Sequence, residues 1–92
     1  MVDRKDILEE ALKLTTKDRR KSYGDPYLNH KRIADIWSVI LDHKVTPSQV
    51  ALCMVGVKMA RLVETYDHLD SFIDGAAYMA IAGEIAERKD DE

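Results

Sequence analysis

The apolar residues recur with the period of an α-helix along nearly the whole chain. In residues 4–17 they form one stripe at i, i+4 spacing, which predicts a first amphipathic helix. The members of this stripe are Ile7, Leu8, Ala11, Leu12 and Thr15. Gly24 interrupts the pattern, so we expect the first helix to end before it.

A second helix is predicted from Asp25-Pro26 to about residues 43–44. Asp is a preferred N-cap, and Pro is favoured at the first helical position. The periodicity places five large apolar residues on the inward face of this helix. They are Ile33, Ile36, Trp37, Ile40 and Leu41.

The remaining residues predict two further helices, over residues 47–66 and 67–88. The segment TPSQ, residues 46–49, is typical of a capping box with Pro at the first helical position. The third helix is apolar on all sides, so we expect it to be buried on all sides. In the fourth, Gly75 and Gly83 indicate close packing against another helix, inside the subunit or across an oligomer.

Together these patterns predict one domain over residues 1–92 with an all-α, four-helix arrangement. No segment alternates with a period of two, so no strand is expected. The short connection between the third and fourth helices favours a central antiparallel hairpin. A chain of 92 residues covers little apolar surface by itself, so we expect a homo-oligomer.

Composition removes several classes of function. The net charge is −3, which disfavours direct binding to nucleic acid. Cys53 is the single cysteine, so an intramolecular disulfide is excluded. No apolar run approaches the ~20 residues of a membrane span, and the charged N-terminus does not resemble a signal peptide. We therefore expect a cytoplasmic protein without a membrane partner.

Five residues place charge and a phenol where the pattern predicts a core. Lys58 and Arg61 share one side of the third helix, while Asp70, Asp74 and Tyr78 follow one stripe of the fourth. In a helix hairpin the two sets face each other. Buried charges need partners, so the set is either a structural network of ion pairs or the lining of a ligand site.

The segment KSYGDPYLNHKR, residues 21–32, suggests what such a ligand is. Tyr23 offers a ring for stacking, Asn29 an amide for a base edge, and the helix beginning at Pro26 a set of free N–H groups for an anion. These features predict a nucleotide pocket. The alternative is that Asp25 only caps the helix and that Asn29 and His30 are solvated polar residues.

These motifs resemble a family of small phage-encoded domains without an assigned function. The resemblance rests on YGDP followed by Asn29, then IADIW, VKMARL and HLDSFIDGAAYMA, and it covers residues 23–84. More distantly, the chain is similar to phage nucleotide-modification domains and to all-α nucleoside triphosphate pyrophosphohydrolases of the MazG and dUTPase type. The MazG-type resemblance implies an oligomer in which carboxylates hold Mg²⁺, and here Asp70 and Asp74 are the candidates.

The chain departs from the MazG-type pattern at the metal-binding carboxylates. No E-x-x-E motif lies upstream at a usable distance, and the third helix carries Lys58 and Arg61, which attract phosphate but repel metal. Nucleotide binding therefore agrees with the sequence better than metal-dependent hydrolysis does.

Three functions follow from these observations. The first is a phage nucleotide-binding protein of the pyrophosphohydrolase type, with its ligand held by Tyr23, Asn29, Lys58, Arg61, Asp70, Asp74 and Tyr78. The second is an oligomeric protein that sequesters a nucleotide-derived immune signal without chemistry. The third is a protein-interaction module that inhibits a host factor.

Overall fold

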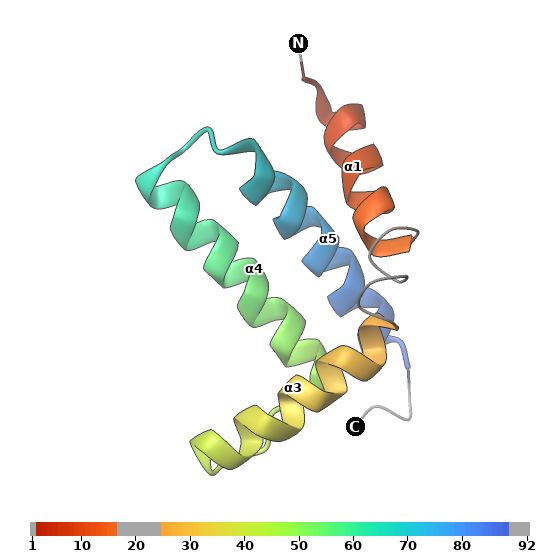
Figure 1. The fold of residues 1–92 in the computed structure, drawn as a ribbon, viewed down its shortest axis with the longest axis vertical. Coiled ribbons are helices and arrows are strands. Elements are labelled where there is room, and N and C mark those ends of the chain that lie inside the picture. Colours follow the sequence, from red (N-terminus) through yellow and green to blue (C-terminus); the bar gives the residue numbers. More distant parts are fainter. Residues whose placement is uncertain (1, 17–24, 89–92) are drawn as a thin grey trace.

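The computed structural model describes residues 2–16 and 25–88, which form four helices and no strand. The helices are α1 (Arg4–Thr16), α3 (Pro26–Leu41), α4 (Pro47–Glu64) and α5 (Leu69–Ala86), as Figure 1 shows. The prediction of an all-α, four-helix fold is confirmed. None of the described helices has the length and apolar character that crossing a membrane requires.

The helices begin where local side-chain hydrogen bonds fix their first turns. The Asp25 side chain accepts a hydrogen bond from the Tyr27 N–H at 3.1 Å, and Pro26 is the first residue of α3. At α4, the Thr46 hydroxyl accepts from the Gln49 N–H, and the Gln49 side chain accepts from the Thr46 N–H. Both predicted starts are confirmed, because an N-cap depends only on neighbours in sequence.

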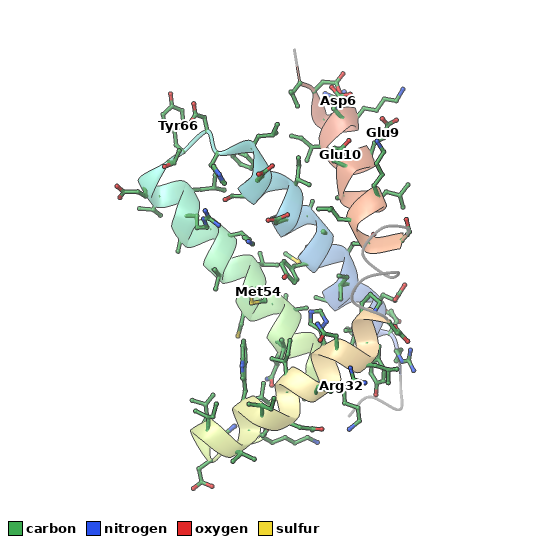
Figure 2. The ribbon with its side chains drawn as sticks, in the orientation of Figure 1. Asp6, Glu9, Glu10, Arg32, Met54 and Tyr66 are labelled. Atoms are coloured by element: carbon green, nitrogen blue, oxygen red, sulfur yellow. The ribbon has the colours of Figure 1, made fainter. Side chains whose placement is uncertain are left out.

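The helices meet mainly through α5. α4 and α5 lie side by side, joined by residues 65–68, and their contact is the most extensive between helices in the described ranges. α1 packs against α5, and α3 crosses the end of the α4–α5 pair (Figure 1). In the connection, Tyr66 projects away from the helices and is 82% exposed (Figure 2).

A small apolar core joins α1 to α5. It contains Ala11, Ile73 and Ala77, with Ile7, Leu14 and Ala76 packed against it. The predicted stripe on α1 is therefore wrong in part, because Leu8 and Leu12 are 63% and 60% exposed. Among the described helices, α1 makes extensive contact with α5 alone. Only a narrow face of its apolar stripe is therefore covered.

The predicted inward face of α3 also needs correction. Ile36, Ile40 and Leu41 are all exposed, while the buried residues of this helix are His30 and Ala34. The buried side chains lie in the half of α3 nearer to its start. The last turns of α3 carry apolar side chains that no other described residue covers.

The expectation that α4 is buried on all sides is wrong for the single chain. Its buried residues, Pro47, Val50 and Ala51, lie in the first turns, whereas Val63 is 88% exposed. Close packing at the glycines is not found within the described part of the chain either. A Cβ at Gly75 would lie an ordinary 3.9 Å from Lys58 Cβ, and one at Gly83 would meet no described atom within 4 Å. Packing of this face across an oligomer stays a prediction.

Candidate functional site

A cleft of about 230 Å³ lies where all four described helices converge. The polar residues that line it are Thr15 of α1, Asn29 and His30 of α3, Lys58 of α4, and Asp74 and Tyr78 of α5. Leu14, Pro26, Ala77 and Ile81 supply its apolar lining. Four of the seven predicted site residues, Asn29, Lys58, Asp74 and Tyr78, are thereby brought to one place.

An ion pair crosses from α4 to α5 at this cleft. Lys58 Nζ lies 3.2 Å from Asp74 Oδ2, and the two side chains are 16% and 26% exposed. The other ion pairs of the described residues join side chains of a single helix that are at least half exposed. The Lys58–Asp74 pair is thus the one held between two helices and partly removed from water.

His30 is the most deeply buried polar side chain of the cleft, with 4% of its surface exposed. Its Nδ1 lies 2.7 Å from the Pro26 carbonyl oxygen, one turn earlier in α3. A carbonyl only accepts, so Nδ1 carries a hydrogen and donates it. The edge of the ring also meets Tyr78, with centroids 6.0 Å apart and planes at 66°.

Two neighbours of His30 leave polar groups unengaged in the cleft. The side-chain amide of Asn29 makes no hydrogen bond to any residue of the ranges 2–16 and 25–88, and neither does the Tyr78 hydroxyl. Both residues are half-buried. Together with the Lys58–Asp74 pair, they offer a ligand both hydrogen-bond donors and acceptors.

Two predicted site residues are not brought to the cleft, and the structure does not describe a third. Arg61 and Asp70 are exposed, do not line the cleft, and take part in no ion pair within the described part of the chain. Their predicted burial is wrong, because the outer turns of α4 and α5 are left uncovered. Tyr23 lies outside the described residues, so its place in the site stays a prediction.

The carboxylates of the described residues do not form a recognisable metal centre. No group of three or more His, Cys, Asp or Glu side chains is placed to hold an ion in residues 2–16 and 25–88. Asp74 is engaged by Lys58, whose charge opposes a second cation. Figure 2 shows Asp6, Glu9 and Glu10 on α1, which does not bring them into the cleft lining. The residues therefore fit Mg²⁺ poorly, and its binding by Asp70 and Asp74 stays a prediction.

Sequence reasoning missed the importance of His30. It was a possible solvated residue of the first turns of α3, but it is buried. A signal for burial was present, because His30, Ile33, Ala34 and Trp37 follow the i, i+3, i+4, i+7 pattern of an inward face. A polar residue in such a stripe is either paired in the core or directed at a site.

Comparison with known proteins places the chain among phage proteins. It is 41% identical over 81 residues to the "Gene 55 protein" of Mycobacterium phage D29, covering 88% of this chain and 54% of that protein. The "Gene 55 protein" of Mycobacterium phage L5 is 36% identical over 76 residues, covering 82% of this chain and 49% of the relative. The chain thus spans about half the length of these curated relatives. No solved structure matches it.

These relatives confirm the predicted resemblance to a phage-encoded family, while the MazG-type resemblance stays a prediction. The family model that matches is a domain of unknown function, DUF6378, and the match extends over residues 6–86. This range includes α3, α4, α5, all of α1 except its first two residues, and every residue that lines the cleft. The chain therefore belongs to the DUF6378 family.

Proposed function

We propose that this chain binds a nucleotide, or a small molecule derived from one, in the cleft between α1, α3, α4 and α5. The observation that carries the proposal is the lining of the cleft. A buried imidazole, an amide, a phenol and an ion pair surround about 230 Å³ of space. That volume is slightly below the ~300–1,000 Å³ of most small-molecule sites, so it suits one nucleobase with its sugar.

The Lys58–Asp74 pair supports a ligand site more than a purely structural role. Apolar residues of similar size often stabilise a fold as well as a buried ion pair does. Stability alone therefore gives no reason for an ion pair beside a cleft, whereas recognition of a polar ligand does. The unengaged amide of Asn29 and hydroxyl of Tyr78 point to the same conclusion, since half-buried polar groups normally find partners.

The phosphates are expected to meet the cations of α4. Lys58 lines the cleft, and Arg61 lies three residues further along the same side of the helix. Arg61 is exposed and makes no ion pair with another described residue, so its guanidinium is available to a phosphate that extends out of the cleft. We therefore propose that the base and sugar lie inside the cleft and the phosphates near solvent.

Binding is favoured over hydrolysis. A two-metal mechanism needs carboxylates clustered around both ions, and Asp74 is already paired with Lys58. A pyrophosphohydrolase of the MazG type is therefore the less favoured form of the proposal. Release of pyrophosphate from a nucleoside triphosphate in the presence of Mg²⁺, lost in Asp74→Asn, would establish it.

A thermal-shift screen of nucleosides, nucleotides and cyclic nucleotides, with and without Mg²⁺, tests the proposal. A ligand at ~100 times its Kd adds about 2.7 kcal/mol to the free energy of unfolding. The double variant Lys58→Met/Asp74→Leu keeps the bulk of the pair and should lose this shift. The matched control is Lys5→Gln/Glu9→Gln, which removes an exposed pair on α1. A ligand that shifts all three proteins equally does not bind in the cleft.

Sequestration of a nucleotide-derived immune signal is one specific form of binding. The low number of available carboxylates favours it over catalysis. A sponge of this kind should bind its ligand stoichiometrically and return it unchanged when the protein is denatured. Chemical modification of the recovered ligand would exclude this form.

A second candidate function, a protein-interaction module, is favoured by the apolar end of α3. Val39 and Ile40 are 81% and 71% exposed. They are consecutive apolar side chains, and contiguous exposed apolar surface is more typical of an interaction site than a single scattered residue is. A partner, either a sister subunit or a host protein, would cover them. This candidate replaces the first if nucleotides fail to shift the melting temperature and Val39→Lys abolishes an interaction of the native protein.

A further inference from the structure

One ring nitrogen of His30 has no hydrogen-bond partner among the described residues. Its Nδ1–H is committed to the Pro26 carbonyl oxygen at 2.7 Å, so in the neutral ring Nε2 is an acceptor. Across residues 2–16 and 25–88, no donor lies within hydrogen-bonding distance of Nε2. The side chain is 4% exposed, so bulk water does not solvate this nitrogen freely.

The ring is also fixed in orientation. The Nδ1 bond ties it to the backbone of α3, and the edge-on contact with Tyr78, at 6.0 Å between centroids, limits rotation from the side of α5. Since Nδ1 is turned back to its own helix, Nε2 lies on the opposite side of the ring, and His30 lines the cleft. A held acceptor inside a cleft requires a donor, from a ligand or an ordered water.

The Asp74 carboxylate adds a second acceptor near His30. It lies 3.2 Å from the Lys58 ammonium, which keeps further N–H groups for a phosphate. A ligand that brings only acceptors would leave Nε2 unpaired and face the carboxylate. A ligand that brings an N–H would satisfy either group.

We infer that His30 selects nucleobases that present an N–H group, such as the exocyclic amino group of adenine or cytosine, by accepting a hydrogen bond at Nε2. The inference rests on the proposed function and adds the chemical class of the base to it. The amino group lies at the buried end of the ligand, and the phosphates point out of the cleft. A base that offers no N–H at that end leaves a buried acceptor unpaired, which weakens binding.

The test compares two pairs of 5′-monophosphates that differ only by the amino group. Adenosine is paired with purine riboside, and cytidine with the pyrimidin-2-one riboside. Binding is measured by calorimetry with the whole chain. The amino-bearing member of at least one pair should bind more tightly by on the order of 10-fold, the ratio expected for one buried hydrogen bond. Equal affinity within both pairs overturns the inference.

Two variants separate the two nitrogens of the ring. His30→Asn keeps an N–H near the position of Nδ1 but has no atom at Nε2, so it should bind both members of a pair equally. His30→Gln places an amide oxygen near the position of Nε2, and it should retain part of the preference. Full discrimination in His30→Asn overturns the inference.

A measurement on the native protein removes dependence on the folding of these variants. The ¹⁵N resonance of His30 Nε2 should show an unprotonated nitrogen in the free protein and move upfield when the amino-bearing nucleotide binds. A doubly protonated ring, or a resonance that does not move while the ligand binds, overturns the inference. If no nucleotide binds at all, the proposed function fails and this inference with it. Binding without preference removes only the inference about His30.

Discussion

The α4–α5 pair carries two sets of charged residues, an inner level and an outer level, each with one cation and one aspartate. The two levels differ in burial although they lie one helical turn apart. At the inner level, Lys58 and Asp74 are mostly buried and 3.2 Å apart. At the outer level, Arg61 and Asp70 are exposed, and within the described ranges neither has an ion-pair partner. Both levels use one cation of α4 and one aspartate of α5.

The difference arises from the other helices. The cleft at the inner level is closed by residues of α1 and α3, namely Leu14, Thr15, Pro26, Asn29 and His30. The outer level lies nearer to the connection at residues 65–68, and neither Arg61 nor Asp70 lines this cleft. Side-chain spacing thus sets which face a charge occupies, while tertiary contacts set how much water it loses.

Assembly would change this comparison most, because a sister subunit can cover the outer level. We expect a homo-oligomer, with a mass at least twice the 10.5 kDa of one chain. Val63 is 88% exposed on α4, so Val63→Lys should return the protein to a monomer if this face is the interface. Multi-angle light scattering measures both masses. A clean monomer of the native protein at tens of micromolar would make the outer level permanently solvent-exposed and refute the expectation.

Removal of one charge at each level should give unequal losses of stability. Asp74→Asn leaves the Lys58 ammonium mostly buried without its counter-ion. Breaking a fully buried pair costs roughly 3–5 kcal/mol, and the remaining exposure here lowers our expectation to about 2 kcal/mol. Asp70→Asn should change the free energy of unfolding by less than about 0.5 kcal/mol. Urea titrations measure both changes in the free energy of unfolding, provided that the m-value is the same in each variant. Equal losses would mean that the two levels are equally solvated in solution.

The substitution Arg61→Met tests whether the exposed cation of the outer level contributes to ligand binding. Arg61 is exposed and has no ion pair among the described residues, so its loss should alter stability by less than about 0.5 kcal/mol. If it contacts a phosphate, nucleotide affinity should fall by about 1 kcal/mol, the upper end for an exposed charge pair. The loss should shrink in high salt, because screening weakens an exposed contact. An unchanged affinity at low salt would remove Arg61 from the site.

The smallest effect is expected at a pair that belongs to neither level. Lys31 and Asp35 of α3 lie 3.5 Å apart, and their side chains are 54% and 71% exposed. Lys31→Gln should lower stability by no more than about 0.5 kcal/mol, as is usual for i, i+4 pairs on a helix surface. Chemical unfolding of Lys31→Gln and of Asp74→Asn, measured in parallel, compares the two losses of stability. A loss as large as that of Asp74→Asn would show that burial does not govern these energies.

The starts of the helices could be predicted from sequence because their causes are local. The Asp25 N-cap and the capping box of Thr46 and Gln49 need only neighbouring residues, and both are present as expected. The approach of Lys58 to Asp74 and Tyr78 also followed from helix periodicity, whereas Asn29 was a candidate because of its amide and its place in the first turns of α3. Lys58, Asp74 and Tyr78 lie on faces that the spacing defines.

Depth could not be predicted in the same way. Arg61 and Lys58 lie on the same side of α4 by their spacing, but only Lys58 lines the cleft together with residues of α1 and α3. The same reason explains the exposed apolar residues of α3 and α4, whose periodicity identifies a face but not whether another helix covers it. His30 was the reverse case, since a polar residue in an apolar stripe was read by its chemistry and not by its position.

The packing of α1 against α5 has a consequence for the order in which the protein folds. These two helices are the first and last of the described elements, and their core joins Ala11 to Ile73 and Ala77. During synthesis the first helix is complete while its partner has not yet been made, so its apolar side chains remain uncovered. The α4–α5 contact is local and can form early, whereas the contact with α1 closes a loop of some sixty residues. Because α1 and α5 both line the cleft, the proposed ligand could bind only after these two helices have met, and its binding would stabilise the step that joins them.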